Sequence, residues 1–395
     1  MQKERSSQVE FILLMASLMS IVALSIDALL PALPKIGTYL SEFNEESHQK
    51  IITFIFLGLG IGQLILGPLS DSFGRKPTVY IGFFIFFIAS IICISTKNFE
   101  VMLLGRVLQG IGLASPRTMC IAIVRDSYSG DYMAKIISIV VMIFILVPVI
   151  APTLGQLLID HFDWKSIFTF NLIYGSIIVT WFWLRQKETL KPEYKIPFRI
   201  SLFRDGTIAF FKIKPAVIYT MLSGFITGAF MVYLSTSQQI IEKQYDLAEY
   251  FPYIFGSSAL SVGLSTFFNS QLVMRFGMKR IVKIALISFV ICALTFVVFF
   301  YNHNPSIVVL MIFFNLQFFC IGFLFGNLRA LAMEPLGHIA GIGSALNGFI
   351  STVMAVPIAN FIGTYITTTV APMFIGFLVF GGVSLVLFYG FRKMA

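Results

Sequence analysis

Charge is scarce in this chain of 395 residues, in which Asp, Glu, Lys and Arg together make up only 12%. Soluble domains average about 25% charged residues. Hydrophobic residues make up 57% of the chain, and the mean hydropathy is +0.88. A chain of this composition cannot cover its apolar surface with polar groups in water, which excludes an ordinary soluble domain.

The apolar residues gather in long runs. Each run has about 20 residues, the length that an α-helix needs to cross a hydrocarbon layer of ~30 Å. A transmembrane β-barrel would instead show segments of ~10 residues with alternating hydrophobicity. The sequence therefore predicts an all-α protein embedded in a lipid bilayer.

Cysteine and histidine are also scarce, with four of each. The cysteines lie inside apolar runs, which excludes a disulfide framework or a zinc site, and the histidines lie at predicted helix ends or in loops. The sequence has no P-loop, no H-E-x-x-H and no G-x-S-x-G. We therefore expect no metal, no cofactor, no ATP-driven step and no enzymatic activity.

The net charge of +9 does not indicate a nucleic-acid partner, because the basic residues follow a topological pattern. Of the 28 Lys and Arg residues, 21 lie at the termini and in every second connection, and five lie in the alternate connections. Basic connections stay in the cytoplasm. This pattern predicts an even number of helices with both termini cytoplasmic.

Twelve membrane spans are predicted, in two groups of six. A basic stretch at 186–214 reads as a cytoplasmic linker, partly an amphipathic surface helix, between an N-terminal bundle at 1–185 and a C-terminal bundle at 215–395. The predicted spans are 11–38, 50–70, 78–96, 99–124, 135–158, 165–185, 215–236, 250–270, 281–301, 305–330, 338–363 and 371–391.

Short repeats relate the two halves. Leu69, Phe73, Gly74 and Lys76 recur 203 residues later as Leu272, Phe276, Gly277 and Lys279. Leu108-Gln109 recurs as Leu316-Gln317, and Val147-Pro148 recurs as Val356-Pro357, after 208 and 209 residues. Similar offsets in corresponding helices indicate an ancient duplication, and therefore a pseudo-symmetric pair of bundles.

Asp27 is the first candidate for chemistry, because it lies within a membrane span. A charged residue deep in such a helix costs roughly 2.5–3.5 kcal/mol on insertion scales, and burial favours the neutral carboxyl, as a proton carrier requires. Pro31 and Pro34 follow, and each prevents regular helix hydrogen bonding. The alternative is an acid near the outer helix end that is paired or reaches the interface.

Arg106 lies in the fourth predicted span, followed by Gln109 and Gly110. A guanidinium cannot be neutralised there, so it needs acidic or polar partners. It either takes part in proton coupling or forms a structural polar clamp with Gln109 and helix-end carbonyls. Arg117 lies two to three turns further on, where it either adds a cationic wall to the cavity or extends toward the cytoplasmic face.

The segment from Gly67 to Pro77 places an acid, Asp71, and a base, Arg75, between two apolar runs and contains Gly74. It predicts a short cytoplasmic turn in which Asp71 faces helix N-termini and Arg75 reaches Asp126 at the inner end of the fourth span. We interpret these residues as a gating network; the alternative is a set of solvated loop charges.

Two further sets of residues complete the candidate site. In the fifth span, Pro148, Pro152 and Gly155 predict a kink and close helix packing. Polar residues of the second half either line a cavity or form interhelical hydrogen bonds. The candidate cavity residues are Tyr233, Gln238, Asn315, Gln317 and Asn347.

The motif G-x-L-x-D-x-x-G-R-K at 67–76 resembles the loop signature of the major facilitator superfamily, and Arg106-x-x-Gln109-Gly110 resembles its fourth-helix motif. The pattern Pro152-x-x-Gly155 resembles the antiporter motif, from which Ala151 and Gln156 depart. Further matches are similar to the Bcr/CflA group of drug:proton antiporters. These are Ile26-Asp27 with Pro31-Ala32-Leu33-Pro34, Val124-Arg125-Asp126 and Glu188-Thr189-Leu190.

The resemblance implies the twelve-helix facilitator fold and a monomer in the bacterial inner membrane. It implies export of drugs such as bicyclomycin or chloramphenicol, or of small metabolites, by alternating access driven by protons. Arg117 is unusual for the group and argues against purely cationic substrates. The alternatives are a dedicated metabolite or siderophore exporter or importer, and a membrane sensor that does not transport.

Overall fold

The computed structural model describes residues 8–42, 45–128, 130–195 and 200–394, and these residues form helices and connections without a strand. The basic residues Lys3, Arg5 and Arg199, counted in the charge pattern above, lie outside the described residues. The first half contains α1 (Gln8–Asp27), η1 (Leu30–Ala32), α2 (Leu33–Tyr39), α3 (Glu45–Phe73), α4 (Arg75–Ser95), α5 (Phe99–Ser127), α6 (Gly130–His161) and α7 (Lys165–Arg185).

The predicted linker contains two helical segments, η2 (Pro192–Tyr194) and α8 (Ile200–Lys212). The second group of long helices begins directly after α8. These elements are α9 (Lys214–Gln239), η3 (Ile240–Gln244), η4 (Ala248–Tyr250), α10 (Phe251–Phe276), α11 (Met278–Phe300), α12 (Ile307–Met333), η5 (Glu334–Ile339), α13 (Ala340–Gly363) and α14 (Ala371–Met394).

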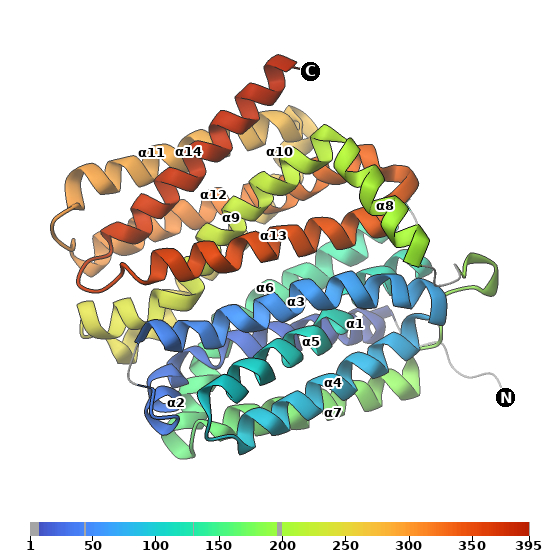
Figure 1. Ribbon diagram of the computed structural model, residues 1–395, viewed down its shortest axis with the longest axis horizontal. Helices are drawn as coiled ribbons and strands as arrows, with labels where there is room; N and C mark the ends of the chain where they lie inside the picture. Colours follow the sequence, from blue (N-terminus) through green and yellow to red (C-terminus); the bar gives the residue numbers. More distant parts are fainter. Residues whose placement is uncertain (1–7, 43–44, 129, 196–199, 395) are drawn as a thin grey trace.

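The long helices lie roughly side by side in two groups, with α1 to α7 on one side and α9 to α14 on the other (Figure 1). The groups meet where α3 packs against α13 and α6 packs against α10. Eleven helices among the described residues are long and apolar enough to cross a membrane. α6 is the twelfth, with 32 residues and a described apolar portion at Leu146–His161. The predicted all-α, twelve-helix membrane fold is confirmed.

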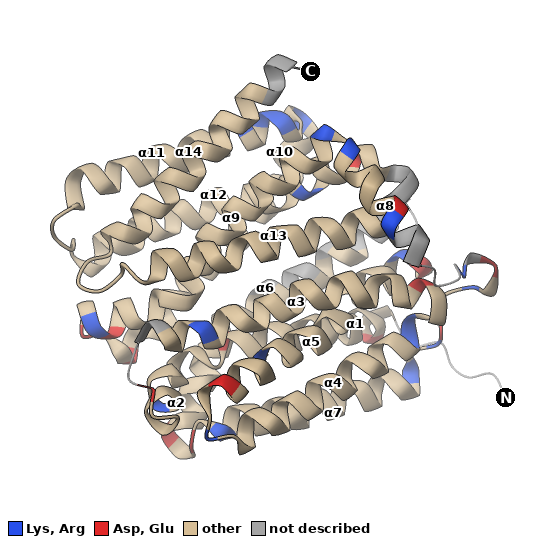
Figure 2. Ribbon diagram, viewed as in Figure 1, with Lys and Arg blue, Asp and Glu red and all other residues tan. Residues whose placement is uncertain are grey.

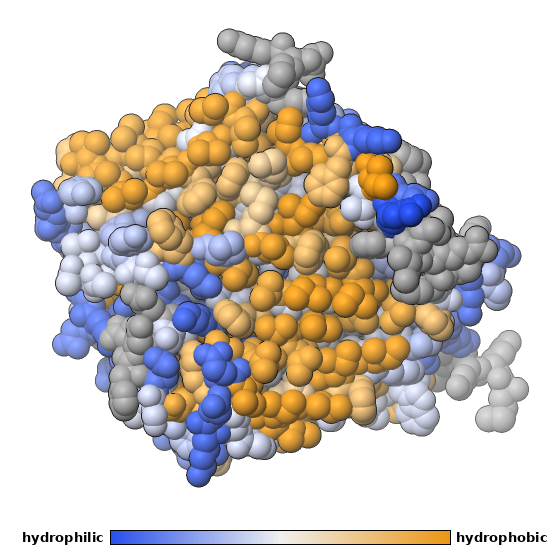
Figure 3. Space-filling view, viewed as in Figure 1, coloured by the Kyte–Doolittle hydropathy of each residue, from blue (hydrophilic) through white to orange (hydrophobic). Residues whose placement is uncertain are grey.

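Charge lies mainly at the two ends of the bundle, and the helices between them carry few charged residues (Figure 2). The surface between the ends is largely hydrophobic (Figure 3), with large exposed apolar side chains such as Phe84 and Val298. Exposure of so much apolar surface to water would be unfavourable, whereas in a bilayer this surface faces lipid. We call the end that holds Gly74 and Gly277 the basic end, and the opposite end, with Asp160 and Asp163, the acidic end.

The pseudo-symmetry predicted from the repeats is visible in the backbone. Gly74 separates α3 from α4 with a φ of 118°, and Gly277 separates α10 from α11 with a φ of 76°. Glycine adopts positive φ at little cost, whereas a residue with a Cβ does not. The same device therefore ends the second and eighth spans and starts the third and ninth.

Two predicted boundaries differ from the structure. The first span is not continuous, because the helix ends at Asp27 and resumes as η1 and α2, which hold Pro31 and Pro34 near their starts. The segment predicted as a turn from Gly67 is helical up to Phe73, and the break is Gly74 alone.

Candidate functional site

Asp27 is the last residue of α1 and is buried, with 5% of its surface exposed. Its carboxylate makes no ion pair or hydrogen bond with any described residue. The C-terminal end of a helix carries partial negative charge, so this position gives a carboxylate no stabilisation from the helix dipole. The segment η1, which follows Asp27, packs against α9 of the second half. The acid is therefore located where α1 breaks, facing the second half of the molecule.

The predicted motif in α6 packs directly against this break. Both Pro148 and Pro152 lie inside the helix, which continues through them. A Cβ at Gly155 would lie 2.0 Å from the carbonyl oxygen of Ala28, the residue after Asp27. Only glycine permits this approach, so the Pro152-x-x-Gly155 pattern fixes the position of the broken helix beside the acid.

Arg106 is 1% exposed and hydrogen-bonds to α1, to α3 and to Gln109 on its own helix. Its Nε donates to the Ile51 carbonyl at 2.9 Å, and its Nη2 donates to the Ser25 carbonyl at 3.1 Å. Its Nη1 donates to Gln109 Oε1 at 2.7 Å. Arg106 is therefore joined to the Asp27 segment through the Ser25 backbone and not through a carboxylate.

Gln109 extends this network toward α4. Its Nε2 donates to Ser90 Oγ at 2.7 Å, and Ser90 Oγ donates to the Phe86 carbonyl at 2.7 Å. Gly110 follows, where an added Cβ would lie 2.0 Å from the Ile55 carbonyl of α3. The R-x-x-Q-G pattern thus combines a buried guanidinium with the close α3–α5 contact that holds its acceptors in place. This is the geometry of a polar clamp, which leaves a role in proton coupling open.

Arg117 also lies on α5 and is partly exposed. It makes no ion pair or hydrogen bond with any described residue.

Three of the predicted gating residues, Asp71, Arg75 and Asp126, form one cluster at the basic end. Arg75 is 3% exposed and contacts Asp71 at 2.5 Å and Asp126 at 2.9 Å. It also donates to Ser70 Oγ at 2.9 Å. The predicted contact between Arg75 and Asp126 is present. Asp71, however, lies in the last turn of α3 and not in a turn between helices.

Glu188 completes this cluster. In the sequence it stood out only as part of the Glu188-Thr189-Leu190 match, which predicted no role for it. Its carboxylate accepts from the backbone N–H groups of Arg75 and Lys76, each at 3.0 Å, at the start of α4. These groups have no acceptor within the helix. A Cβ at Gly74 would lie 2.6 Å from Glu188 Oε2. Gly74 therefore admits an acid from the predicted linker, and the cluster joins α3, α4, α5 and that segment.

Gly67, the remaining predicted gating residue, faces the other half. The nearest atom to an added Cβ there is the Cβ of Ala345 on α13, at 3.9 Å. Gly67 therefore lies at the α3–α13 contact, apart from the charged cluster.

Four of the five candidate cavity residues form interhelical hydrogen bonds. Tyr233 donates to Ser258 at 3.0 Å, Asn347 to Thr220 at 2.7 Å and Gln317 to the Phe289 carbonyl at 3.2 Å, whereas Asn315 accepts from Ser261 at 2.9 Å. Tyr233 also packs against Phe255, Phe314 and Phe318. Gln238 lines a cavity, where it donates to Glu242.

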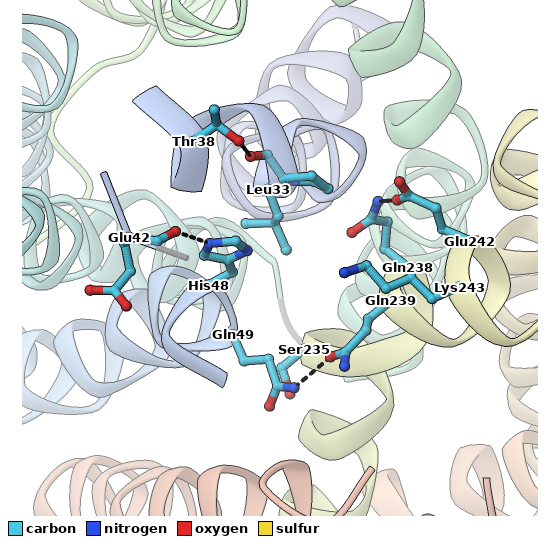
Figure 4. A pocket seen from close by; sticks show the side chains of 11 residues that line it. Leu33, Thr38, Glu42, His48, Gln49, Ser235, Gln238, Gln239, Glu242 and Lys243 are labelled. Atoms are coloured by element: carbon cyan, nitrogen blue, oxygen red, sulfur yellow. Dashed lines mark hydrogen bonds between the residues drawn. The ribbon is translucent and has the colours of Figure 1, made fainter. Parts of the chain in front are cut away.

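That cavity lies between the two halves at the acidic end and has a volume of about 190 Å³. Its walls come from the α2 region and the start of α3 on one side, and from α9 and η3 on the other (Figure 4). Gln49 Nε2 donates to Gln239 Oε1 at 2.9 Å across it, and nearby Thr53 donates to Asn360 at 2.9 Å. The halves are therefore hydrogen-bonded to each other at the acidic end.

Curated sequences resemble this chain over nearly its whole length. It is 31% identical over 377 residues to the uncharacterized MFS-type transporter YdgK of Bacillus subtilis, covering 94% of this chain and 92% of the relative. It is 25% identical to the bicyclomycin resistance protein homolog of Haemophilus influenzae, covering 94% and 93%. It is also 25% identical to the multidrug resistance protein MdtL of Salmonella paratyphi C, covering 86% and 84%.

Solved structures share the fold at low sequence identity. The D-xylose-proton symporter superposes with a TM-score of 0.75 at 15% identity, covering 96% of this chain and 97% of that one. The human organic anion transporter MFSD10 superposes with a TM-score of 0.69 at 16% identity, covering 98% and 99%.

The family model described as Major Facilitator Superfamily matches residues 15–359. With this match and the bicyclomycin and multidrug resistance relatives, the resemblance to the Bcr/CflA group is confirmed, and the chain belongs to the major facilitator superfamily of membrane transporters.

Proposed function

We propose that this protein is a proton-driven exporter of drugs or small metabolites that works by alternating access. The observation that carries the proposal is Asp27, a buried acid without an ion-pair partner among the described residues, located at a helix break that faces the second half. An acid inside a membrane helix is by default a functional group. Asp27 binds a proton in one state and releases it in the other.

The relatives support the substrate class. Proteins named for bicyclomycin and multidrug resistance align with most of this chain. We therefore expect neutral or charged organic molecules to bind between the halves, in competition with protonation of Asp27. No enzymatic step and no cofactor is part of this mechanism, and a single chain carries it out.

The orientation follows from charge. The basic end holds Arg75, Lys76, Lys279 and Arg280, whereas the acidic end holds few basic residues. Under the positive-inside rule the basic end faces the cytoplasm, which places the termini inside a bacterial inner membrane. Arg75, Asp71, Asp126 and Gly67 would then act at the cytoplasmic gate.

The test is energy-dependent efflux of a drug panel, including bicyclomycin and chloramphenicol, from a bacterium that lacks its major pumps. We expect efflux that a protonophore abolishes. Asp27→Asn removes the ionisable group with little change in size and should abolish it as well. Asp160→Asn is the matched control, because Asp160 is an exposed acid at the acidic end.

Normal gradient-driven efflux by Asp27→Asn would refute the assignment of Asp27. Absence of efflux for every drug, with good membrane expression, would refute multidrug export and favour a carrier dedicated to one metabolite.

A further inference from the structure

A second cavity lies at the basic end of the second half. Its walls come from α9, the α10–α11 junction, α12, η5 and α14. It has a volume of about 810 Å³, which lies within the range of about 300–1,000 Å³ that ligand pockets cover. The residues that line it all belong to the second half. It is therefore separate from the cavity between the halves at the acidic end.

The lining of this cavity carries an excess of positive charge. Lys279, Arg280 and Lys283, on the first two turns of α11, all line it. Among the described residues that line it, Glu334 of η5 is the only acid. None of the three cations makes an ion pair or hydrogen bond with a described residue. Lys and Arg gather at this end of the bundle, where α10 meets α11 (Figure 2). The cavity is therefore suited to an anion.

Aromatic and apolar side chains form the rest of the lining. The Arg280 guanidinium lies 5.5 Å from the centre of the Phe276 ring, which also lines the cavity. Tyr219, Leu331 and Phe388 line it as well and are buried, with at most 5% of their surface exposed. Lys279 and Arg280 are exposed. Positive charge therefore lies toward solvent, and apolar surface lies further inside.

The equivalent place in the first half holds an anion that the chain itself supplies. There the Glu188 carboxylate accepts from the N–H groups of the first two residues of α4. The repeat relates those residues to Met278 and Lys279 at the start of α11, and both line the cavity. A Cβ at Gly277 would have nothing within 4 Å. No described carboxylate therefore takes the place of Glu188 in the second half.

We propose that this cavity binds the phosphate headgroup of an acidic phospholipid from the leaflet at the basic end. Basic pockets between membrane helices bind such headgroups. Met274, in the last turn of α10 beside the cavity, is 88% exposed, and Tyr389 on α14 is 37% exposed and lies 5.4 Å from Lys283 Nζ. Apolar surface of this kind faces lipid and can hold acyl chains, for which a soluble phosphate compound has no counterpart.

The test is native mass spectrometry of the purified protein in a neutral detergent. The protein is titrated with dioleoyl phosphatidylglycerol or with dioleoyl phosphatidylcholine, which has the same acyl chains but no net charge. We expect the first phosphatidylglycerol to bind about tenfold more tightly than phosphatidylcholine, or better. Lys279→Gln should weaken phosphatidylglycerol about fivefold, and Gln at all three cavity cations should weaken it still further. Glu334→Gln should strengthen it.

The matched control removes the same charge at the same end but outside the cavity. It replaces three exposed lysines with Gln, namely Lys187, Lys212 and Lys214. Phosphatidylglycerol affinity should be largely unchanged. Melting temperatures in detergent verify that each variant is folded, and Lys279→Gln alters only an exposed side chain. Equal weakening in the two triple variants would show diffuse attraction to the basic end and overturn the proposal. Equal binding of the two lipids by the wild type would overturn it as well.

A second arm distinguishes a lipid from a soluble phosphate compound. Glycerol 3-phosphate is added to the complex with phosphatidylglycerol at the same concentration as the lipid. Retention of the lipid supports the proposal, whereas its displacement would assign the cavity to a soluble anion and overturn the lipid assignment. The proposal requires a protein that spans a bilayer and does not rest on the proposed function. Absence of drug efflux with lipid binding intact would refute that function and leave this inference standing.

Discussion

At the scale of single residues, Arg106 shows how a permanent charge is accommodated at membrane depth. Two of its three acceptors are backbone carbonyls, those of Ile51 and Ser25. Ser25 lies in the last turn of α1, where carbonyls lack helical partners and carry partial negative charge. The guanidinium therefore has an electrostatic partner that is built from backbone.

Removal of this side chain should destabilise the protein. Arg106→Ala leaves the Ser25 carbonyl without a donor and Gln109 Oε1 with only the Cys93 thiol at 3.9 Å, at a cost of about 1–3 kcal/mol for a buried unsatisfied group. Arg117→Ala should cost much less, because Arg117 has no hydrogen bond to a described residue. The measurement is the melting temperature of both variants in detergent. Equal melting temperatures would contradict the clamp interpretation of Arg106.

At the scale of elements, the α3–α4 junction depends on one backbone conformation. Gly74 has positive φ and adjoins Glu188, whereas its counterpart Gly277 has positive φ with nothing within 4 Å of an added Cβ. Substitutions at the two glycines can therefore be compared. Gly277 reports the cost of the backbone conformation alone, whereas Gly74 also reports the cost of displacing Glu188.

We expect Gly277→Ala to cost about 1–3 kcal/mol, the usual cost of holding a residue with a Cβ in a sparsely populated region of positive φ. Gly74→Ala should cost more, because the methyl group would displace Glu188 from the N-terminus of α4. Unfolding of both variants in mixed micelles is the measurement. A smaller effect at Gly74 than at Gly277 would mean that Glu188 contributes nothing to the junction.

At the scale of the whole molecule, the two halves are hydrogen-bonded at the acidic end through Gln49 and Gln239. Alternating access requires this contact to separate. The structure therefore represents the state that is closed at the acidic end.

A covalent link across Gln49 and Gln239 should trap this state. Cysteines at both positions, joined by a short bis-maleimide, should abolish transport but leave substrate binding from the basic side. Each single cysteine variant treated with the same reagent is the control. Undiminished transport by the fully cross-linked protein would show that these residues do not separate during the cycle.

The chain by itself determined the elements and the outline of the site. Apolar runs long enough to span a bilayer permit little besides helices, since unpaired backbone groups are too costly in lipid. The same cost made Asp27, Arg106 and Arg117 conspicuous among apolar neighbours. The contact of Arg75 with Asp126 was also predictable, because short helix connections bring their ends together.

The tertiary structure decided which polar groups meet. The break after Asp27, the use of the Ser25 carbonyl by Arg106 and the capping of α4 by Glu188 all depend on distant segments packing together. These contacts join residues that lie far apart in sequence, so they form only when the helices pack together.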